Sequence, residues 1–318
     1  MTGRQFIYWT ALGVALSLVL PVAGNLVAAH LVPHIPFVQL PIHSLLESSG
    51  GLMAIMIAGI LVAERGRSVG REHYSWMAGA LVGMGVLDLF HAAVMPGARF
   101  VWLHSVATFV GGALFALVWW PPERSSERML RAFPWIVLVA TVLFGITSCF
   151  GSWLPAMVTP GGEFTLLALG LNMGGGLGFV LAAMYFVRRY YLTGNHENWL
   201  FAVHTGLFGA AGILFEMSIL WDASWWWWHI LRLLAYLAAL SFATRAYLAA
   251  ERDVLTLNRE LARVNQNLDQ TVADRTKRLE ASEERYALAV RRAALEFLRH
   301  EGRAIVTAID IESRNSMH

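Results

Sequence analysis

The sequence has little cysteine and little charge, and both shortages limit what the chain can be. Its 318 residues include one cysteine, Cys149, which excludes an internal disulfide framework and a cysteine-rich metal site. Charged residues make up 14% of the chain and hydrophobic residues 57%, and the mean hydropathy is +0.52. Soluble domains carry about 25% charged residues. The composition therefore predicts a polytopic membrane protein. The net charge of +2 says little, and no nucleic-acid partner is expected.

The N-terminus also lacks the cleavage site of a signal peptide. Arg4 precedes an apolar run of about 25 residues with no small-residue cleavage motif, which indicates an uncleaved first span. Eight apolar segments are long enough, at about 20 residues each, to cross a hydrocarbon core. They cover approximately residues 6–30, 40–63, 74–95, 100–120, 133–151, 164–187, 198–220 and 226–249. We therefore expect an all-α bundle of about eight transmembrane helices, with membrane lipids as its surroundings.

Basic residues in the loops alternate from one side of the predicted bundle to the other. Those that follow the second, fourth, sixth and eighth spans are Arg65, Arg67, Arg71, Arg124, Arg128, Arg131, Arg188, Arg189, Arg245 and Arg252. The remaining loops carry only Arg99. By the positive-inside rule, the N- and C-termini are then both cytoplasmic. The tryptophan run from Trp225 to Trp228 falls at the outer interface, where it is interpreted as an anchor that would also cover the residues beneath it.

Five candidate metal ligands lie in the second, third and fourth spans: His43, Glu47, Asp88, His91 and His104. Spacings of i,i+4 for the first pair and i,i+3 for the second place each pair on one face of its helix. At about 1.5 Å per residue, all five are expected within roughly 10 Å of the outer boundary. Ionisable groups inside a membrane usually face a bundle interior and have a function, so these residues are the first candidates for a site.

Two later spans contribute to the same layer. Glu216 and Asp222 lie at the end of the seventh span, and His229 and Arg232 lie at the start of the eighth. We expect these four residues to support the candidate ligands or to couple them to the last span. By contrast, His204 lies deeper in its helix and is expected to be a packed histidine without a ligand.

Three interpretations of these polar residues remain open. Imidazole and carboxylate ligands without thiolate suit a zinc, copper or iron ion. Two histidines from different helices can instead clamp a haem b, which needs no CxxCH motif. A third interpretation is a polar network that binds no metal and holds the helices together, with or without an organic ligand.

The composition changes abruptly after the eighth span. From Glu251 to about Arg292 the chain is rich in Glu, Arg, Asn and Leu. Apolar residues follow alternate steps of three and four, at Val254, Leu257, Leu261, Val264 and Leu268. This pattern is the heptad seam of a parallel coiled coil and predicts a parallel homodimer. No proline or glycine separates the seam from the last span, so the two are expected to form one helix.

Two stretches resemble known families. LNRELARVNQNLDQTVADRTKRLEASEERYALAV resembles the signalling helix of bacterial sensor histidine kinases and diguanylate cyclases, followed by the first helix of a PAS domain. The membrane part resembles the membrane-associated sensor (MASE) domains of such proteins, which have HxxxE on one span, here His43 and Glu47, and LDxxH on the next, here Leu87, Asp88 and His91. The resemblance implies a sensory input module in the bacterial inner (cytoplasmic) membrane, with a cytoplasmic kinase or cyclase output or a response partner.

The resemblance also implies a division of the chain. We expect a transmembrane sensor domain at 1–250, a signalling-helix coiled coil at 251–292, and a truncated or atypical tail at 293–318. The chain shows no phosphoacceptor histidine helix, ATP-binding glycine boxes or GGDEF signature. It is therefore not expected to be an enzyme by itself, and the output is expected on a missing segment or a partner.

An intramembrane metal hydrolase of the ceramidase type is the alternative from a different class. Ser44 and Asp88 would then join the histidines at one metal. Members of that family carry an HxxxH pair on a late span. Here Trp225 occupies the position of the histidine that would pair with His229. A coiled coil after the last span also has no purpose in a hydrolase.

Overall fold

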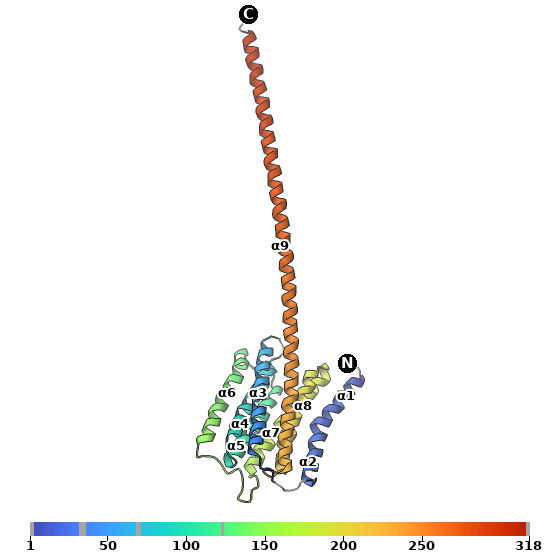
Figure 1. The fold of residues 1–318 in the computed structure, drawn as a ribbon, viewed down its shortest axis with the longest axis vertical. Coiled ribbons are helices and arrows are strands. Elements are labelled where there is room, and N and C mark those ends of the chain that lie inside the picture. The colour runs from blue at the N-terminus through green and yellow to red at the C-terminus, as the bar shows by residue number, and fades with distance from the viewer. Residues whose placement is uncertain (1–2, 32–35, 68–70, 122–123, 316–318) are drawn as a thin grey trace. The chain divides into compact units, whose positions relative to one another are not determined.

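The computed structural model describes residues 3–31, 36–67, 71–121 and 124–315, and these residues are almost entirely helical (Figure 1). In chain order the elements are α1 (Gly3–Val14), the π-helix η1 (Ala15–Val19), α2 (Leu20–Leu31), α3 (Leu40–Arg67), α4 (His73–Ala93), α5 (Ala98–Ala116), η2 (Leu117–Trp119), α6 (Glu127–Phe150), α7 (Leu166–Thr193), α8 (His196–Leu214), η4 (Phe215–Met217) and α9 (Ala223–Asn315). Within these ranges there is no strand, only an isolated bridge between Val158 and Phe164. The predicted all-α class is confirmed.

Eight helical segments in the described part of the chain are long and apolar enough to cross a membrane. Their bounds are Ile7–His30, Leu40–Gly66, His73–Ala93, Ala98–Trp119, Glu127–Phe150, Leu166–Thr193, His196–Met217 and Ala223–Arg303. The predicted polytopic bundle is therefore confirmed. The fifth segment starts at Glu127, earlier than its apolar run, because its first turns are charged and amphipathic.

Polar side chains define where several of these helices begin. Ser126, Thr165 and Asn195 precede α6, α7 and α8, and the side chain of each accepts a hydrogen bond from a backbone N–H of the first turn. Such caps satisfy N–H groups that have no partner within the helix. Gly194 ends α7 in the left-handed conformation, with φ of 64°, which glycine adopts without strain.

The central helix of the bundle is α4, which packs against α3, α5 and α6, while α7 packs between α5 and α8. The α1–η1–α2 segment lies beside α8 at the edge of the bundle (Figure 1). Two glycines permit the contact of α5 with α7: a Cβ atom at Gly112 would lie 1.9 Å from the carbonyl oxygen of Gly175. Small residues of this kind let helix backbones approach closely in a membrane. The contact fixes α5, which carries His104.

The chain divides into two compact units, residues 1–248 and residues 249–318. The first unit holds the helical bundle and all the candidate ligands. In the second unit, the described residues as far as Asn315 continue helix α9, and their side chains are exposed from residue 251 to residue 303.

Candidate functional site

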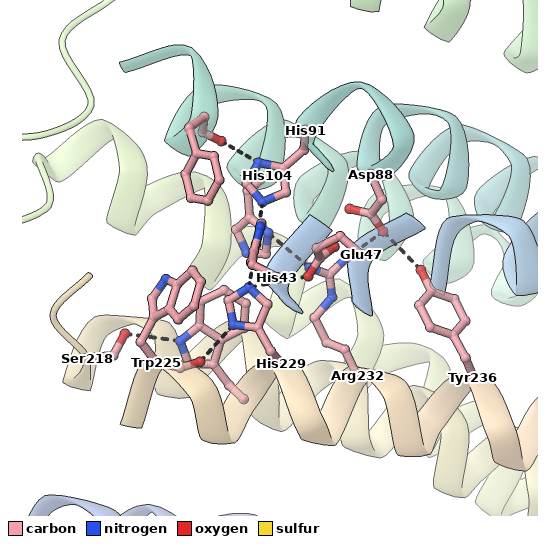
Figure 2. A network of polar contacts seen from close by, with 12 residues as sticks. His43, Glu47, Asp88, His91, His104, Ser218, Trp225, His229, Arg232 and Tyr236 are labelled. Carbon is pink, nitrogen blue, oxygen red and sulfur yellow. Dashed lines mark hydrogen bonds and ion pairs between the residues drawn. The ribbon is translucent and has the colours of Figure 1, made fainter. Parts of the chain in front are cut away.

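Eight polar side chains from α3, α4, α5 and α9 meet inside the bundle (Figure 2). We call them the polar cluster: His43, Glu47, Asp88, His91, His104, His229, Arg232 and Tyr236. None is more than 5% exposed. The HxxxE and DxxH spacings bring each pair to one helix face, as the sequence predicts. The polar cluster has two halves, one built around His43 and the other around Arg232.

Three imidazoles converge in the first half, with His43 between the other two (Figure 2). The Nε2 atom of His43 lies 3.1 Å from Nε2 of His229 and 3.2 Å from Nε2 of His91. The carboxylate oxygen Oε1 of Glu47 lies 3.3 Å from Nε2 of His229. One ligand atom from each of these four residues can be chosen so that all lie within 4.8 Å of one another, the arrangement expected around a single ion.

Backbone carbonyls fix the orientation of two of these rings. Nδ1 of His91 is 2.8 Å from the carbonyl oxygen of Phe100, and Nδ1 of His229 is 2.8 Å from that of Trp225. A carbonyl oxygen only accepts, so each Nδ1 carries the proton and donates it. In the neutral rings, Nε2 then presents a lone pair to the centre of this first half of the polar cluster. Backbone carbonyls commonly hold metal-binding histidines in this way.

Arg232 is the centre of the second half. Its Nη2 donates to Oδ2 of Asp88 at 2.6 Å, and its Nη1 lies 3.2 Å from Oε1 of Glu47 and 2.9 Å from Nδ1 of His104. Tyr236 donates to the same Asp88 oxygen at 3.0 Å. Arginine remains charged and only donates, so His104 must accept through Nδ1. One cation thus holds two carboxylates and an imidazole from three other helices.

Glu47 belongs to both halves of the polar cluster. The same oxygen, Oε1, is 3.2 Å from Arg232 and 3.3 Å from His229. His229 and Arg232 lie three residues apart on α9, so they project from one side of that helix. A change in the partner of Glu47 therefore changes the contacts of α9.

Aromatic side chains close the polar cluster. The ring centroids of Trp225 and Trp228 lie 3.8 Å and 3.7 Å from that of His229, and both tryptophans are 1% exposed. These two tryptophans cover the histidines, as predicted for the tryptophan run. Phe100 packs on His91 with ring centroids 4.2 Å apart. The cavity beside His91 has a volume of about 10 Å³, enough for about one water molecule.

Two of the predicted supporting residues lie outside the polar cluster. Glu216 is exposed in the 3₁₀ turn η4, which turns its side chain away from the histidines. Asp222 caps α9: its Oδ1 accepts from the backbone N–H of Trp225 at 2.6 Å. The prediction that Glu216 and Asp222 lie in one layer with the histidines is therefore wrong. Helix α8 ends at Leu214 and α9 begins at Ala223, so both residues lie in the connection between these helices.

His204 is packed in the core, as expected. It is fully buried, and its Nδ1 donates to the carbonyl of Ala235 at 2.8 Å. Tyr236 is a cluster residue that the sequence analysis missed. Its position four residues after Arg232 places both on one helix face, which is the signal that could have found it.

The fold is that of a polytopic membrane protein. Its buried polar cluster brings histidines and carboxylates close enough together to hold one ion. A family model for the membrane-associated sensor domain MASE3 matches residues 37–246, and the chain belongs to this family. The matched range contains the whole polar cluster and begins after α2. Searches of curated proteins and of solved structures gave no match. The chain therefore contains a membrane-associated sensor domain.

Proposed function

We propose that this chain is the input module of a bacterial signalling protein in the cytoplasmic membrane. A ligand, in the first place a zinc, copper or iron ion, binds the polar cluster, and α9 relays the bound state to a cytoplasmic kinase or cyclase output. One observation carries the proposal. Helix α9 supplies His229, Arg232 and Tyr236 to the polar cluster, and the same helix carries the heptad seam.

The relay requires two arrangements of α9 with different ligand affinities. A ligand that binds both arrangements equally cannot shift the equilibrium between them. A ligand held by His229 meets this requirement, because it bonds directly to α9 and competes with Arg232 for Glu47. Residues 251–292 then act as the signalling helix that carries the change toward the output.

A parallel homodimer is the proposed form of the signalling helix. In the single chain, Val254, Leu257, Leu261, Val264 and Leu268 are 52–68% exposed. Exposed apolar residues at alternate spacings of three and four become buried when two such helices pair. Dimerisation therefore gives these side chains the partner that a single helix lacks.

The alternating arginines support an orientation with both termini in the cytoplasm. The polar cluster then lies near the outer face, beneath the start of α9 at Ala223. A signal from outside the cell reaches it over a short path, while the output end of α9 lies in the cytoplasm.

The other ligand classes have less support. Pockets for drug-sized ligands have volumes of about 300–1,000 Å³, whereas the cavity at the edge of the polar cluster, beside His91 and His104, measures about 10 Å³. This volume counts against haem. For a hydrolase, Ser44 is a poor candidate, because its Oγ donates to the carbonyl of Ala92 at 2.9 Å. A metal-free polar network remains the outcome if no ion binds.

The test joins an intact histidine kinase output to the chain after residue 290. Kinase activity is measured in chelator-treated membranes before and after addition of Zn²⁺, Cu²⁺ or Fe²⁺. We expect one of these ions to change the activity, and we expect His229→Ala to abolish the change without loss of dimer. His204→Ala, at a buried histidine outside the polar cluster, should leave the change intact. An unchanged response in His229→Ala would place the relay elsewhere.

A further inference from the structure

We propose that His43, His91, His229 and Glu47 form a four-ligand centre for one divalent first-row metal ion of the zinc type. Asp88 and His104 are not ligands of this centre and serve Arg232 instead. The inference makes the site of the proposed function specific. Metal binding is measured on the isolated chain, however, so the centre and the relay can fail separately.

A shortage of hydrogen-bond donors is the first argument for a cation. Nε2 of His91 and Nε2 of His229 both present lone pairs, because their Nδ1 protons are donated to backbone carbonyls. His43 lies between them and can donate one proton from Nε2 to only one of them. Oε1 of Glu47 adds a further acceptor 3.3 Å from His229. Arg232 already donates to this oxygen, so one of the two imidazole acceptors is left without a donor. A buried acceptor without a donor is costly, and a cation at the centre satisfies it together with the other three ligand atoms.

The spacing of the ligand atoms is the second argument. Zinc binds imidazole nitrogen at about 2.0–2.1 Å, so neighbouring ligands of a tetrahedron lie about 3.3–3.4 Å apart. Three ligand pairs in the first half of the polar cluster lie at 3.1, 3.2 and 3.3 Å. One of the two imidazole pairs can be a hydrogen bond, whereas the other pair and the His229–Glu47 pair bring lone pairs face to face. All three distances are close to the edges of a coordination tetrahedron. Small ring movements give the remaining pairs, which lie within 4.8 Å, the same spacing.

Charge is the third argument. With ionised carboxylates and neutral histidines, Arg232 supplies one positive charge against the two negative charges of Glu47 and Asp88. Without a metal ion, ionisation of both carboxyl groups leaves an excess of negative charge, which is costly away from water and favours a proton on one of them. A divalent ion reverses this excess, and Arg232 keeps its short contact with Asp88 when Glu47 turns to the ion.

The surroundings of the first half of the polar cluster favour a closed centre. The carbonyls of Phe100 and Trp225 orient two ligands, and Trp225 and Trp228 exclude water around His229. Four protein ligands fill a tetrahedral ion, whereas a catalytic zinc keeps a position open for water or substrate. The centre therefore holds an ion as a signal or a structural element and does not catalyse hydrolysis.

The experiment measures metal in the full chain, purified in detergent, stripped with a chelator and reloaded with Zn²⁺ or Co²⁺. We expect about one ion per chain, and an intense visible absorption for Co²⁺ in four-coordinate geometry. His91→Gln should lower the affinity for Zn²⁺ at least tenfold, since even residues that only orient a ligand contribute that much. His104→Gln keeps an acceptor for Arg232 and should retain the ion, as should His204→Gln.

Three results would overturn the centre: no stoichiometric ion in the wild type, an equal loss of ion in His204→Gln, or a loss in His104→Gln as large as in His91→Gln. X-ray absorption of the zinc-loaded wild type tests the ligands without any substitution. It should show only nitrogen and oxygen neighbours with imidazole outer-shell scattering, and a sulfur neighbour would contradict the assignment. If the ion binds but the fused kinase does not respond, the centre stands and the relay fails.

Discussion

Nη2 of Arg232 lies 2.6 Å from Oδ2 of Asp88, and this ion pair joins α9 to α4 inside the bundle. Arg232 is 4% exposed and Asp88 is fully buried. Buried charges lose their hydration, and only good pairing and further hydrogen bonds compensate for that loss. The pair therefore holds the start of α9 against the most enclosed helix of the bundle.

The first prediction concerns this pair. Asp88→Asn and Arg232→Gln should each lower the free energy of unfolding by about 3–5 kcal/mol, because each leaves a buried charge without its partner. The double variant should lose clearly less than the sum of the two. Unfolding in mixed detergent micelles measures all three variants, and a strictly additive double variant would contradict the predicted coupling.

The second prediction separates a ligand from a structural carboxylate on the same helix. Glu47→Gln should lower the affinity for Zn²⁺ at least tenfold, because a neutral amide replaces a charged ligand. Glu64→Gln is the matched control. Glu64 is also a buried glutamate of α3, but it pairs with Arg71 outside the polar cluster. Equilibrium competition with a metal indicator measures both variants, and similar losses in the two would point to a general effect on folding.

The sequence predicted the helices and the pairs within each helix because both follow from local periodicity. Hydropathy identified the spans, and the i,i+4 spacing placed His43 beside Glu47 on one face. Local spacing does not determine which faces of different helices meet. The sequence therefore placed His229 among the possible haem ligands and the residues that support a metal site, but not among the metal ligands, although its Nε2 lies 3.1 Å from that of His43.

The residues around the start of α9 show a second limit. Depth in the membrane grouped Glu216 and Asp222 with the histidines, but depth does not give direction. A 3₁₀ turn leaves Glu216 exposed, and Asp222 satisfies backbone N–H groups at the helix start. An aspartate just before a helical run is a capping signal, so the role of Asp222 could have been predicted from the sequence.

The third prediction tests the contact between α5 and α7. Gly112→Ala should destabilise the protein by about 1–3 kcal/mol, because the new methyl group overlaps the backbone of Gly175. Gly170→Ala is the control on α7, since no atom outside its own helix turn lies within 4 Å of the added Cβ. The control should be neutral or slightly stabilising. Thermal unfolding of purified protein compares them, and equal melting temperatures would contradict the close contact.

The fourth prediction concerns orientation in the membrane. In a Cys149→Ser background, Gly161→Cys places a thiol between α6 and α7, and Ser125→Cys places one just before α6. The positive-inside rule predicts that position 161 is outside and position 125 is inside. A membrane-impermeant maleimide should label position 161 in intact spheroplasts and position 125 only after permeabilisation. The reverse pattern would invert the proposed topology.

The fifth prediction concerns the seam. Leu261→Glu and Leu268→Glu together should weaken dimerisation at least tenfold, because each chain loses two apolar seam contacts and like charges face each other across the helices. Glu260→Lys and Asn267→Glu change charge beside the seam and should leave the dimer intact. Cysteine cross-linking at position 261 in native membranes measures the wild-type dimer, and mass photometry compares the variants in detergent. Membrane insertion should not change, since these positions follow the last span. A wild-type chain that remains monomeric in both measurements would contradict the proposed dimeric signalling helix.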